Sequence, residues 1–196
     1  MKKHVRLFIC LFIPYLIFAH PHVFVDYTII FIIEQGQMIG IETEWFFDEM
    51  YSSNLIQNYD EDNDGIFSDK EIATMEKDAF SNLKNYNYFT YVSIDHDRFD
   101  VNSVKNFSSS IQDSKVVYSF FIPCPVVITP SFREIEICIY DESYYVDLLP
   151  LEDNKVFVSN DKDLDYDIEI FEDMRESRDY GEIYPYSIRL TMRKKI

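Results

Sequence analysis

The feature that most constrains the fold is an acidic run in the first half of the chain, from Asp60 to Glu71. It reads Asp-Glu-Asp-Asn-Asp-Gly-Ile-Phe-Ser-Asp-Lys-Glu, with carboxylates at its first, third, fifth and last positions and glycine at its sixth. This is the spacing of an EF-hand loop, in which oxygen atoms surround one calcium ion between two helices. The run therefore predicts a helix–loop–helix unit.

The expected calcium ligands follow from the loop positions, and Gly65 supplies the sharp turn that other residues resist. These ligands are Asp60, Asp62, Asp64, Ile66 through its backbone carbonyl, Ser68 directly or through water, and Glu71 with both oxygens. The alternative is an acidic surface turn that binds no ion. The equally acidic run 161–167 lacks the glycine and the closing glutamate. Because no second loop of this kind is present in the sequence, we expect a structural role and not a sensing one.

Helical spacing of apolar residues flanks the loop on both sides. The first pattern covers 48–59 and the second covers 68–85, and Phe67 is expected to anchor the loop to the core. Ser68 followed by Glu71 is a capping box, which marks the start of the second helix.

The rest of the chain has strand composition, with aromatic and β-branched residues between polar turns. Strands are expected at 23–33, 38–46, 88–94, 115–122, 135–146, 155–158, 165–171 and 183–192. The predicted fold class is α+β: an antiparallel β-sandwich or half-barrel in which the helical unit, at about 48–86, is an insertion. Residues 20–196 are expected to form a single domain.

The N-terminus has the pattern of a secretory signal peptide. Basic residues precede the uncharged stretch 7–18, which is too short to span a bilayer and ends at the small residue Ala19. We expect cleavage after Ala19, so that 1–19 is removed and the mature protein is periplasmic without stable membrane insertion. The alternative is an uncleaved anchor.

The formal net charge is −17. Such an acidic surface repels nucleic acid and anionic lipid, and it attracts cations. Nucleic acid is therefore not an expected partner.

Two cysteines remain after the expected cleavage. A hairpin centred on Ser131 would place Cys124 opposite Cys138, where a disulfide could form in an oxidising compartment. The alternative is a pair of buried thiols.

Cleavage would expose His20-Pro21-His22 at the new N-terminus. The α-amine and the imidazoles of His20 and His22 are nitrogen ligands, which favour zinc, nickel, cobalt or copper. Pro21 has no backbone N–H, so a site that uses the second backbone amide is blocked. The alternative is a solvated tail. His96, between two aspartates in an expected surface turn, is a further candidate ligand.

Four segments together resemble one family: 20–25, the Trp-Phe-Phe-Asp-Glu-Met-Tyr-Ser run at 45–52, the loop 60–71, and 140–146. The chain is similar to bacterial periplasmic proteins of a domain-of-unknown-function family associated with NicO-type nickel/cobalt permeases, some of them described as periplasmic components of transport systems, including zinc uptake. The resemblance implies an accessory protein that handles a transition metal for an inner-membrane permease on a separate polypeptide. Cys124 and Cys138 lie outside the recognised pattern.

Two other functions compete with transport. One is a calcium-stabilised copper carrier or interaction module without a permease. The other is a copper oxidase built on the N-terminal histidine, which would need a further imidazole. We expect no enzyme, because no nucleophile–base set, phosphate loop or zinc-hydrolase motif is present in the sequence.

Overall fold

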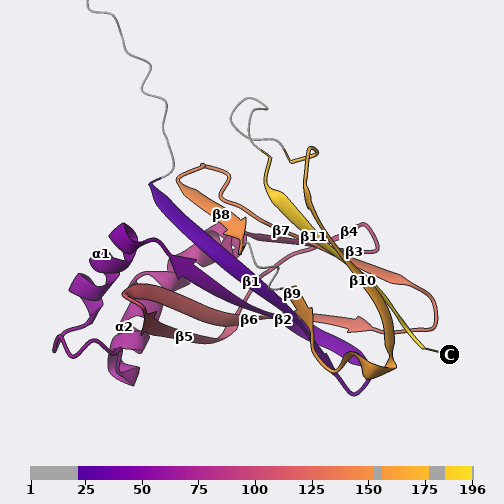
Figure 1. The fold of residues 1–196 in the computed structure, drawn as a ribbon, viewed down its shortest axis with the longest axis horizontal. Coiled ribbons are helices and arrows are strands. Elements are labelled where there is room, and N and C mark those ends of the chain that lie inside the picture. Colours follow the sequence, from indigo (N-terminus) through magenta and orange to yellow (C-terminus); the bar gives the residue numbers. More distant parts are fainter. Residues whose placement is uncertain (1–21, 152–155, 177–183, 196) are drawn as a thin grey trace, which may run out of the picture.

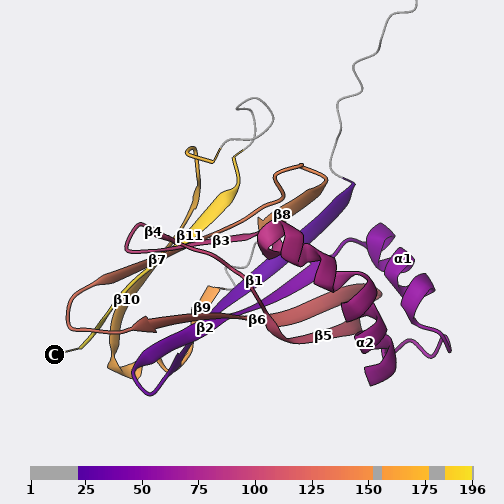
Figure 2. The ribbon, with the colours of Figure 1, turned by 180° about the vertical axis from the view of Figure 1, so that it is seen from behind.

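The computed structural model describes residues 22–151, 156–176 and 184–195. Within them, two mostly antiparallel sheets and a helical segment form an α+β fold (Figures 1 and 2). The expected signal peptide, 1–19, lies outside the described residues. Among the helices that the structure describes, none combines the length and apolar character needed to cross a membrane.

The first sheet, which we call sheet A, is built around the two N-terminal strands. Its order is β5 (Lys105–Gln112), β6 (Lys115–Val127), β2 (Gln37–Phe47), β1 (Val23–Glu34) and β8 (Val146–Pro150), with β9 (Val156–Val158) also paired to β1. The pairs of β1 with β8 and β9 are parallel, and the others are antiparallel.

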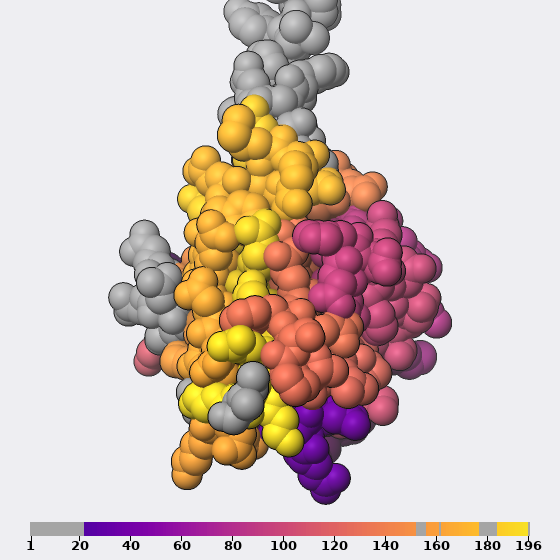
Figure 3. All heavy atoms as spheres, turned by 90° about the vertical axis from the view of Figure 1, so that its right-hand side faces the viewer, coloured from indigo at the N-terminus to yellow at the C-terminus, as the bar shows by residue number. Residues whose placement is uncertain are grey.

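The second sheet, sheet B, is antiparallel throughout. Its order is β10 (Leu164–Glu172), β11 (Tyr186–Lys194), β7 (Arg133–Ile139), β3 (Thr90–Ile94) and β4 (Asp97–Phe99). A short 3-10 turn, η2 (Asp161–Asp163), precedes β10. Figure 3 shows β10 and β11 (gold and yellow), the β6–β7 connection (coral) and the β1–β2 turn (indigo) on one side of the molecule.

The helical segment lies between β2 and β3 in the sequence. It contains α1 (Glu49–Tyr59), α2 (Asp69–Asp78) and the 3-10 helix η1 (Phe80–Phe89). The predicted first helix and the capping box that begins the second are confirmed. The second helix is shorter than the predicted 68–85, because the backbone tightens to a 3-10 helix from Phe80 and turns at Asn87 and Tyr88, which have positive φ.

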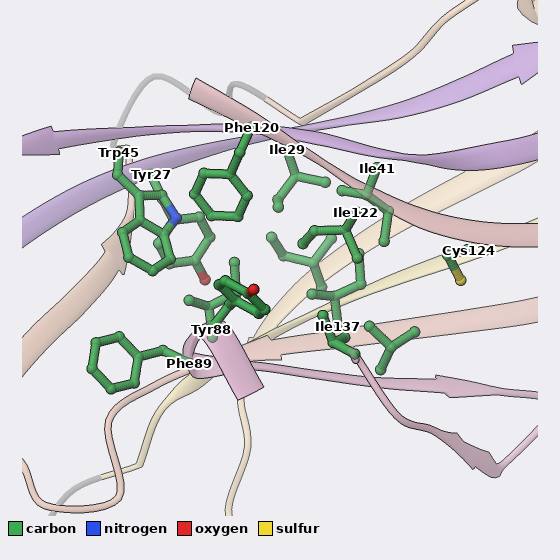
Figure 4. Packing of buried hydrophobic residues seen from close by; sticks show 14 of the residues in the cluster. Tyr27, Ile29, Ile41, Trp45, Tyr88, Phe89, Phe120, Ile122, Cys124 and Ile137 are labelled. Carbon is green, nitrogen blue, oxygen red and sulfur yellow. The ribbon is translucent and has the colours of Figure 1, made fainter. Parts of the chain in front are cut away.

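One hydrophobic core connects both sheets and the helices. Ile29, Ile41 and Ile122 of sheet A belong to the same buried cluster as Ile137 and Ile188 of sheet B. Figure 4 shows Trp45, Tyr27 and Phe120 gathered near Tyr88 and Phe89 at the end of η1. The indole of Trp45 stacks on Phe89 at 6.1 Å between ring centroids, so aromatic packing fixes η1 against sheet A.

The predicted hairpin centred on Ser131 is wrong. Strand β6 pairs with β2 and β5 in sheet A, whereas β7 pairs with β3 and β11 in sheet B. Cys124 and Cys138 therefore do not face each other across a ladder, and both are buried thiols. The expected strand 135–146 also ends early, at Ile139, because the buried Asp141 accepts hydrogen bonds from the backbone N–H groups of Ser143, Tyr145 and Val146 and folds a turn before β8.

Strands β4 and β5 were not predicted. Strand β5 contains three consecutive serines and few apolar residues, so its sequence lacks a strand signal. It forms at the edge of sheet A, where pairing with β6 and the packing of Phe107 on Phe80, at 4.1 Å between centroids, hold it in place.

Candidate functional site

The acidic loop is held between α1 and α2, and both helices are fixed to the core. Asp48 caps α1 by accepting hydrogen bonds from the backbone N–H groups of Met50 and Tyr51. The hydroxyl of the buried Ser52 donates to the carbonyl of Phe47 at 3.3 Å and accepts from the N–H of Val116 at 2.9 Å. These bonds attach α1 to strands β2 and β6, so the loop begins at the end of a helix that is fixed to sheet A.

The far side of the loop is anchored by apolar contacts. Phe67 is 6% exposed and Met75 is fully buried, and both belong to the core cluster. Ile66, the neighbour of Phe67, is 68% exposed. Phe67 therefore anchors the loop in the core, as the sequence predicted, while Ile66 beside it faces solvent.

Three of the predicted ligand side chains come together. One carboxylate oxygen from each of Asp60, Asp62 and Glu71 lies within 4.8 Å of the others. Asp60 and Glu71 are each 5% exposed, whereas Asp62 is exposed. This is the one group of histidine, cysteine or acidic side chains with such spacing that the described part of the chain contains.

The carboxylates also fold the loop. Asp60 accepts hydrogen bonds from the backbone N–H groups of Asp64 at 3.2 Å and Gly65 at 3.1 Å. Asp64 in turn accepts one from the N–H of Ile66 at 2.8 Å. Gly65 has φ +82°, which residues with a Cβ rarely adopt, so the predicted turn at this glycine is confirmed.

Glu71 is the most constrained acid of the loop. Its Oε1 accepts a hydrogen bond from the N–H of Glu61 at 2.6 Å, and its Oε2 accepts from the N–H and the hydroxyl of Ser68 at 2.8 and 2.7 Å. Hydrogen bonds from the backbone and hydroxyl of Ser68, then from Glu61, lower the pKa of Glu71. The group is therefore a carboxylate at neutral pH, the form that a metal ion requires.

The other predicted ligands have different surroundings. Asp64 lies outside the group of three, with its Oδ1 accepting from Ile66. The hydroxyl of Ser68 is used in the capping box with Glu71. The donor set contains hard oxygen atoms without nitrogen or sulfur, which fits calcium or magnesium better than a transition metal.

The candidate nitrogen ligands are only partly described. His20 lies outside the described residues. The side chain of His22 is exposed. The backbone N–H of His22 donates a hydrogen bond to the carbonyl of Tyr145 at 2.9 Å, and the centroids of the His22 and Tyr145 rings are 5.1 Å apart. His96 occupies the turn between β3 and β4, as predicted, and its Nδ1 lies 3.3 Å from an oxygen of Glu134.

Sequence reasoning missed a hollow of about 610 Å³ on the outer side of sheet B. Its lining includes Tyr91, Arg98, Glu136, Cys138 and Arg175. Arg175 binds Asp173 at 2.6 Å and also pairs with Glu136. The charged side chains that line the hollow thus form ion pairs largely with one another. The alternation of charged residues along β7 could have indicated a polar outer face, but the distant Arg175 could not be placed from sequence.

The chain is similar in sequence to known bacterial proteins. An uncharacterized 15.5 kDa protein in the trpE 3' region of Spirochaeta aurantia is 30% identical over 95 residues, which are 48% of this chain and 67% of that protein. An uncharacterized protein of Haemophilus influenzae is 28% identical over 146 residues, 74% of this chain and 69% of that protein. Residues 5–172 match the family described as Protein of unknown function (DUF1007). Since this match spans most of the sequence, the chain belongs to the DUF1007 family.

Proposed function

We propose that the loop from Asp60 to Glu71 binds a calcium ion and that the ion stabilises the α1–α2 unit of a periplasmic metal-handling protein. One observation carries the calcium part: oxygen atoms of Asp60, Asp62 and Glu71 lie within 4.8 Å of one another, two of them on carboxylates that are 5% exposed. Asp64, Ser68 and the carbonyl of Ile66 would complete the oxygen ligands.

The electrostatics of the loop support a cation. Like charges at this distance repel each other, more strongly where water is excluded. The nearby Lys70 pairs with Glu61 at 2.9 Å on the exposed side of the loop. A divalent ion among the three carboxylates would replace their repulsion by attraction.

The proposed role of the ion is structural. The loop joins two short helices, and isolated helices of this length are marginal in water. An ion shared by Asp60 at the end of α1 and Glu71 in the first turn of α2 would hold both helices in the orientation that buries Phe67 and Met75. Exported modules of this kind bind calcium at about 10⁻⁴ to 10⁻³ M.

For the wider role, we propose a periplasmic accessory protein of a nickel, cobalt or zinc transport system. Its partner would be an inner-membrane NicO-type permease on a separate polypeptide, as the family resemblance implies. The observation that favours metal handling is the position of His22, whose side chain is exposed while its backbone is tied to Tyr145. The α-amine and His20 would supply the other nitrogen ligands.

Two alternatives remain for this wider role: a copper carrier or interaction module without a permease, and an N-terminal-histidine copper oxidase. Oxygen uptake by the copper-loaded chain would identify the oxidase. Capture of the chain by the purified permease, lost on His22→Ala, would favour the transport role over the carrier.

Calorimetric titration of the chain beginning at His20 tests both sites. Calcium, zinc, nickel, cobalt and copper are compared on the wild-type protein and on Asp60→Ala, His20→Ala and His22→Ala. We expect Asp60→Ala to lose calcium binding and to keep transition-metal binding, and the histidine variants to do the reverse. Calcium affinity unchanged by Asp60→Ala would refute the loop site, and transition-metal affinities unchanged by both histidine variants would refute the terminal site.

A further inference from the structure

The acidic residues on the outer faces of the two sheets differ in whether they form ion pairs. On sheet B, arginines cross between strands to reach the carboxylates. Arg189 of β11 binds Glu136 of β7 at 2.9 Å and Glu169 of β10 at 2.8 Å, and Arg193 binds Asp165 at 3.0 Å. The charges of that face are therefore largely satisfied within the protein.

The outer face of sheet A lacks such arginines at its β2–β1–β8 end. Each of these strands presents an acid and an apolar residue two positions apart, while the residues between them point into the core. Strand β2 presents a further exposed acid, Glu42, on the same side. We call this surface the acidic face; it consists of Phe24, Asp26, Glu44, Phe46, Asp147 and Leu149. Among the described residues, its three carboxylates have no ion pair and no side-chain hydrogen bond.

The strand register arranges the acids and the apolar residues alternately. Asp26 lies directly between Phe46 on one neighbouring strand and Leu149 on the other. Phe24 lies opposite Asp147. Phe24 is 50% exposed and Leu149 is 40% exposed, so the apolar part of the face is open to a partner.

The carboxylates of the acidic face act on one another. Burial, followed by the charge of Asp26, raises the pKa of Asp147. The two half-buried acids thus repel each other in a partly dehydrated setting, which a nearby cation would relieve.

We propose that the acidic face docks a partner protein whose surface alternates lysine or arginine with apolar side chains. Basic groups would pair with Asp26, Glu44 and Asp147, and apolar groups would cover Phe24, Phe46 and Leu149. A second copy of this chain fits poorly, because it would bring the same acids together. Nucleic acid and anionic lipid are repelled for the same reason.

The spacing defines the partner further. Residues two apart on a strand, such as Phe24 and Asp26, are separated by about 6.5 to 7 Å along the chain. An extended segment has the same repeat, with successive side chains on alternate sides. A strand or extended loop with basic and apolar residues at every second position therefore matches the repeat along one strand. Because neighbouring strands lie about 4.8 Å apart, its long basic side chains can also reach the acids of the adjacent strands.

A fluorescent peptide tests this match. The probe is an extended peptide of about eight residues in which one face alternates lysine and leucine at the strand repeat, and its comparison peptide has glutamate at each lysine. Fluorescence anisotropy is measured at about 150 mM salt, where long-range attraction to the acidic protein is screened. The triple variant Asp26→Asn, Glu44→Gln, Asp147→Asn removes the charges of the face. The control Glu76→Gln, Asp97→Asn, Asp113→Asn removes the same number of charges from exposed positions elsewhere.

We expect the lysine peptide to bind the wild-type protein and the control variant alike, and to bind the triple variant about tenfold more weakly, since exposed ion pairs are individually weak and three are lost. The glutamate peptide should not bind. Equal binding to all three proteins, or no binding of the lysine peptide to the wild type, would overturn the proposal. The comparison of the two peptides uses the wild type alone and does not depend on how the variants fold.

The same proteins are examined by light scattering. A dimer that forms with increasing concentration and is abolished by the triple substitution would assign the face to a second copy and would also overturn the proposal. A monomer at all concentrations agrees with it.

Discussion

Glu71 accepts a hydrogen bond from the backbone N–H of Glu61 at 2.6 Å, although the two residues are ten positions apart. This bond joins the end of the acidic loop to its beginning. With the bonds from Ser68 to the same carboxylate, it fixes the position of the closing carboxylate. Because Glu71 is already oriented by these bonds, the ordering of its side chain adds little to the cost of binding the proposed calcium ion.

If the loop holds calcium, the thermal stability of the protein depends on it. We expect the melting temperature of the wild type to rise with calcium and to fall when EDTA is added, because a ligand that binds only the folded state stabilises it. Asp60→Asn should remove this response. Asp69→Asn, which changes an exposed acid of the loop that is not an expected ligand, should keep it. A calcium response that survives in Asp60→Asn would contradict the assignment.

Gly65 and Gly36 form a matched pair. Their φ values are +82° and +76°, and a Cβ on either would meet no atom within 4 Å. Changing either to alanine should therefore cost about 1 kcal/mol of unfolding free energy through backbone strain alone, measured by urea unfolding without calcium. With calcium present, only Gly65→Ala should also lose affinity for the ion. An equal calcium affinity in the two variants would show that the turn at Gly65 has no part in binding.

Asp173 gives the protein a pH-dependent contribution to stability. Hydrogen bonds from Arg175 and Ser187 lower its pKa from 3.8 to about 2. A lowered pKa means that this stabilisation is present above about pH 4 and is lost as the pH falls towards 2. Arg175 is partly exposed and screened, so we expect Asp173→Asn to cost roughly 1–2 kcal/mol at pH 7 and little at pH 2.

Asp165→Asn is the control for this measurement. Asp165 also pairs with an arginine, Arg193 at 3.0 Å, but its side chain is 41% exposed. Its loss should change the unfolding free energy by about 0.5 kcal/mol or less. Equal losses from the two variants at pH 7, measured by urea unfolding, would contradict the role given to Asp173.

Cys124 and Cys138 should be found as thiols. Burial raises the pKa of Cys124 to about 12, so its thiol should not react with Ellman's reagent in the native protein. In the chain beginning at His20, both thiols should react after unfolding without any reductant. Failure of the unfolded, unreduced protein to react would reveal a disulfide and contradict the assignment of both cysteines as thiols.

The sequence was most informative where local rules decide the structure. The capping box of Ser68 and Glu71, the turn at Gly65 and the burial of Phe67 each depend on residues within a few positions of one another, and the structure has all three. The long strands at 23–33 and 38–46 were predictable because their apolar residues favour a sheet buried on one face and partly covered on the other.

Pairing between distant segments was not predictable. Strands β6 and β7 follow each other with a short connection, which favours a hairpin. In the structure, however, the chain crosses from one sheet to the other at this connection, so that β6 and β7 pair with different strands on opposite sides of the core. The serine-rich β5 forms only because β6 and Phe80 are available to it. The gathering of Asp60, Asp62 and Glu71 followed from loop spacing, whereas the acidic face required a register that no local pattern specifies.

Equilibrium dialysis of the chain beginning at His20 against calcium at about 1 mM tests the central claim most directly, because exported modules bind in this range. Calcium in the protein compartment is then measured by elemental analysis, with Asp60→Ala dialysed alongside to account for ions held by the general negative charge. The account predicts about 0.5 to 0.9 additional ions for each wild-type chain, the occupancy at this calcium concentration for dissociation constants of about 10⁻³ to 10⁻⁴ M. Equal calcium in the two samples would contradict it.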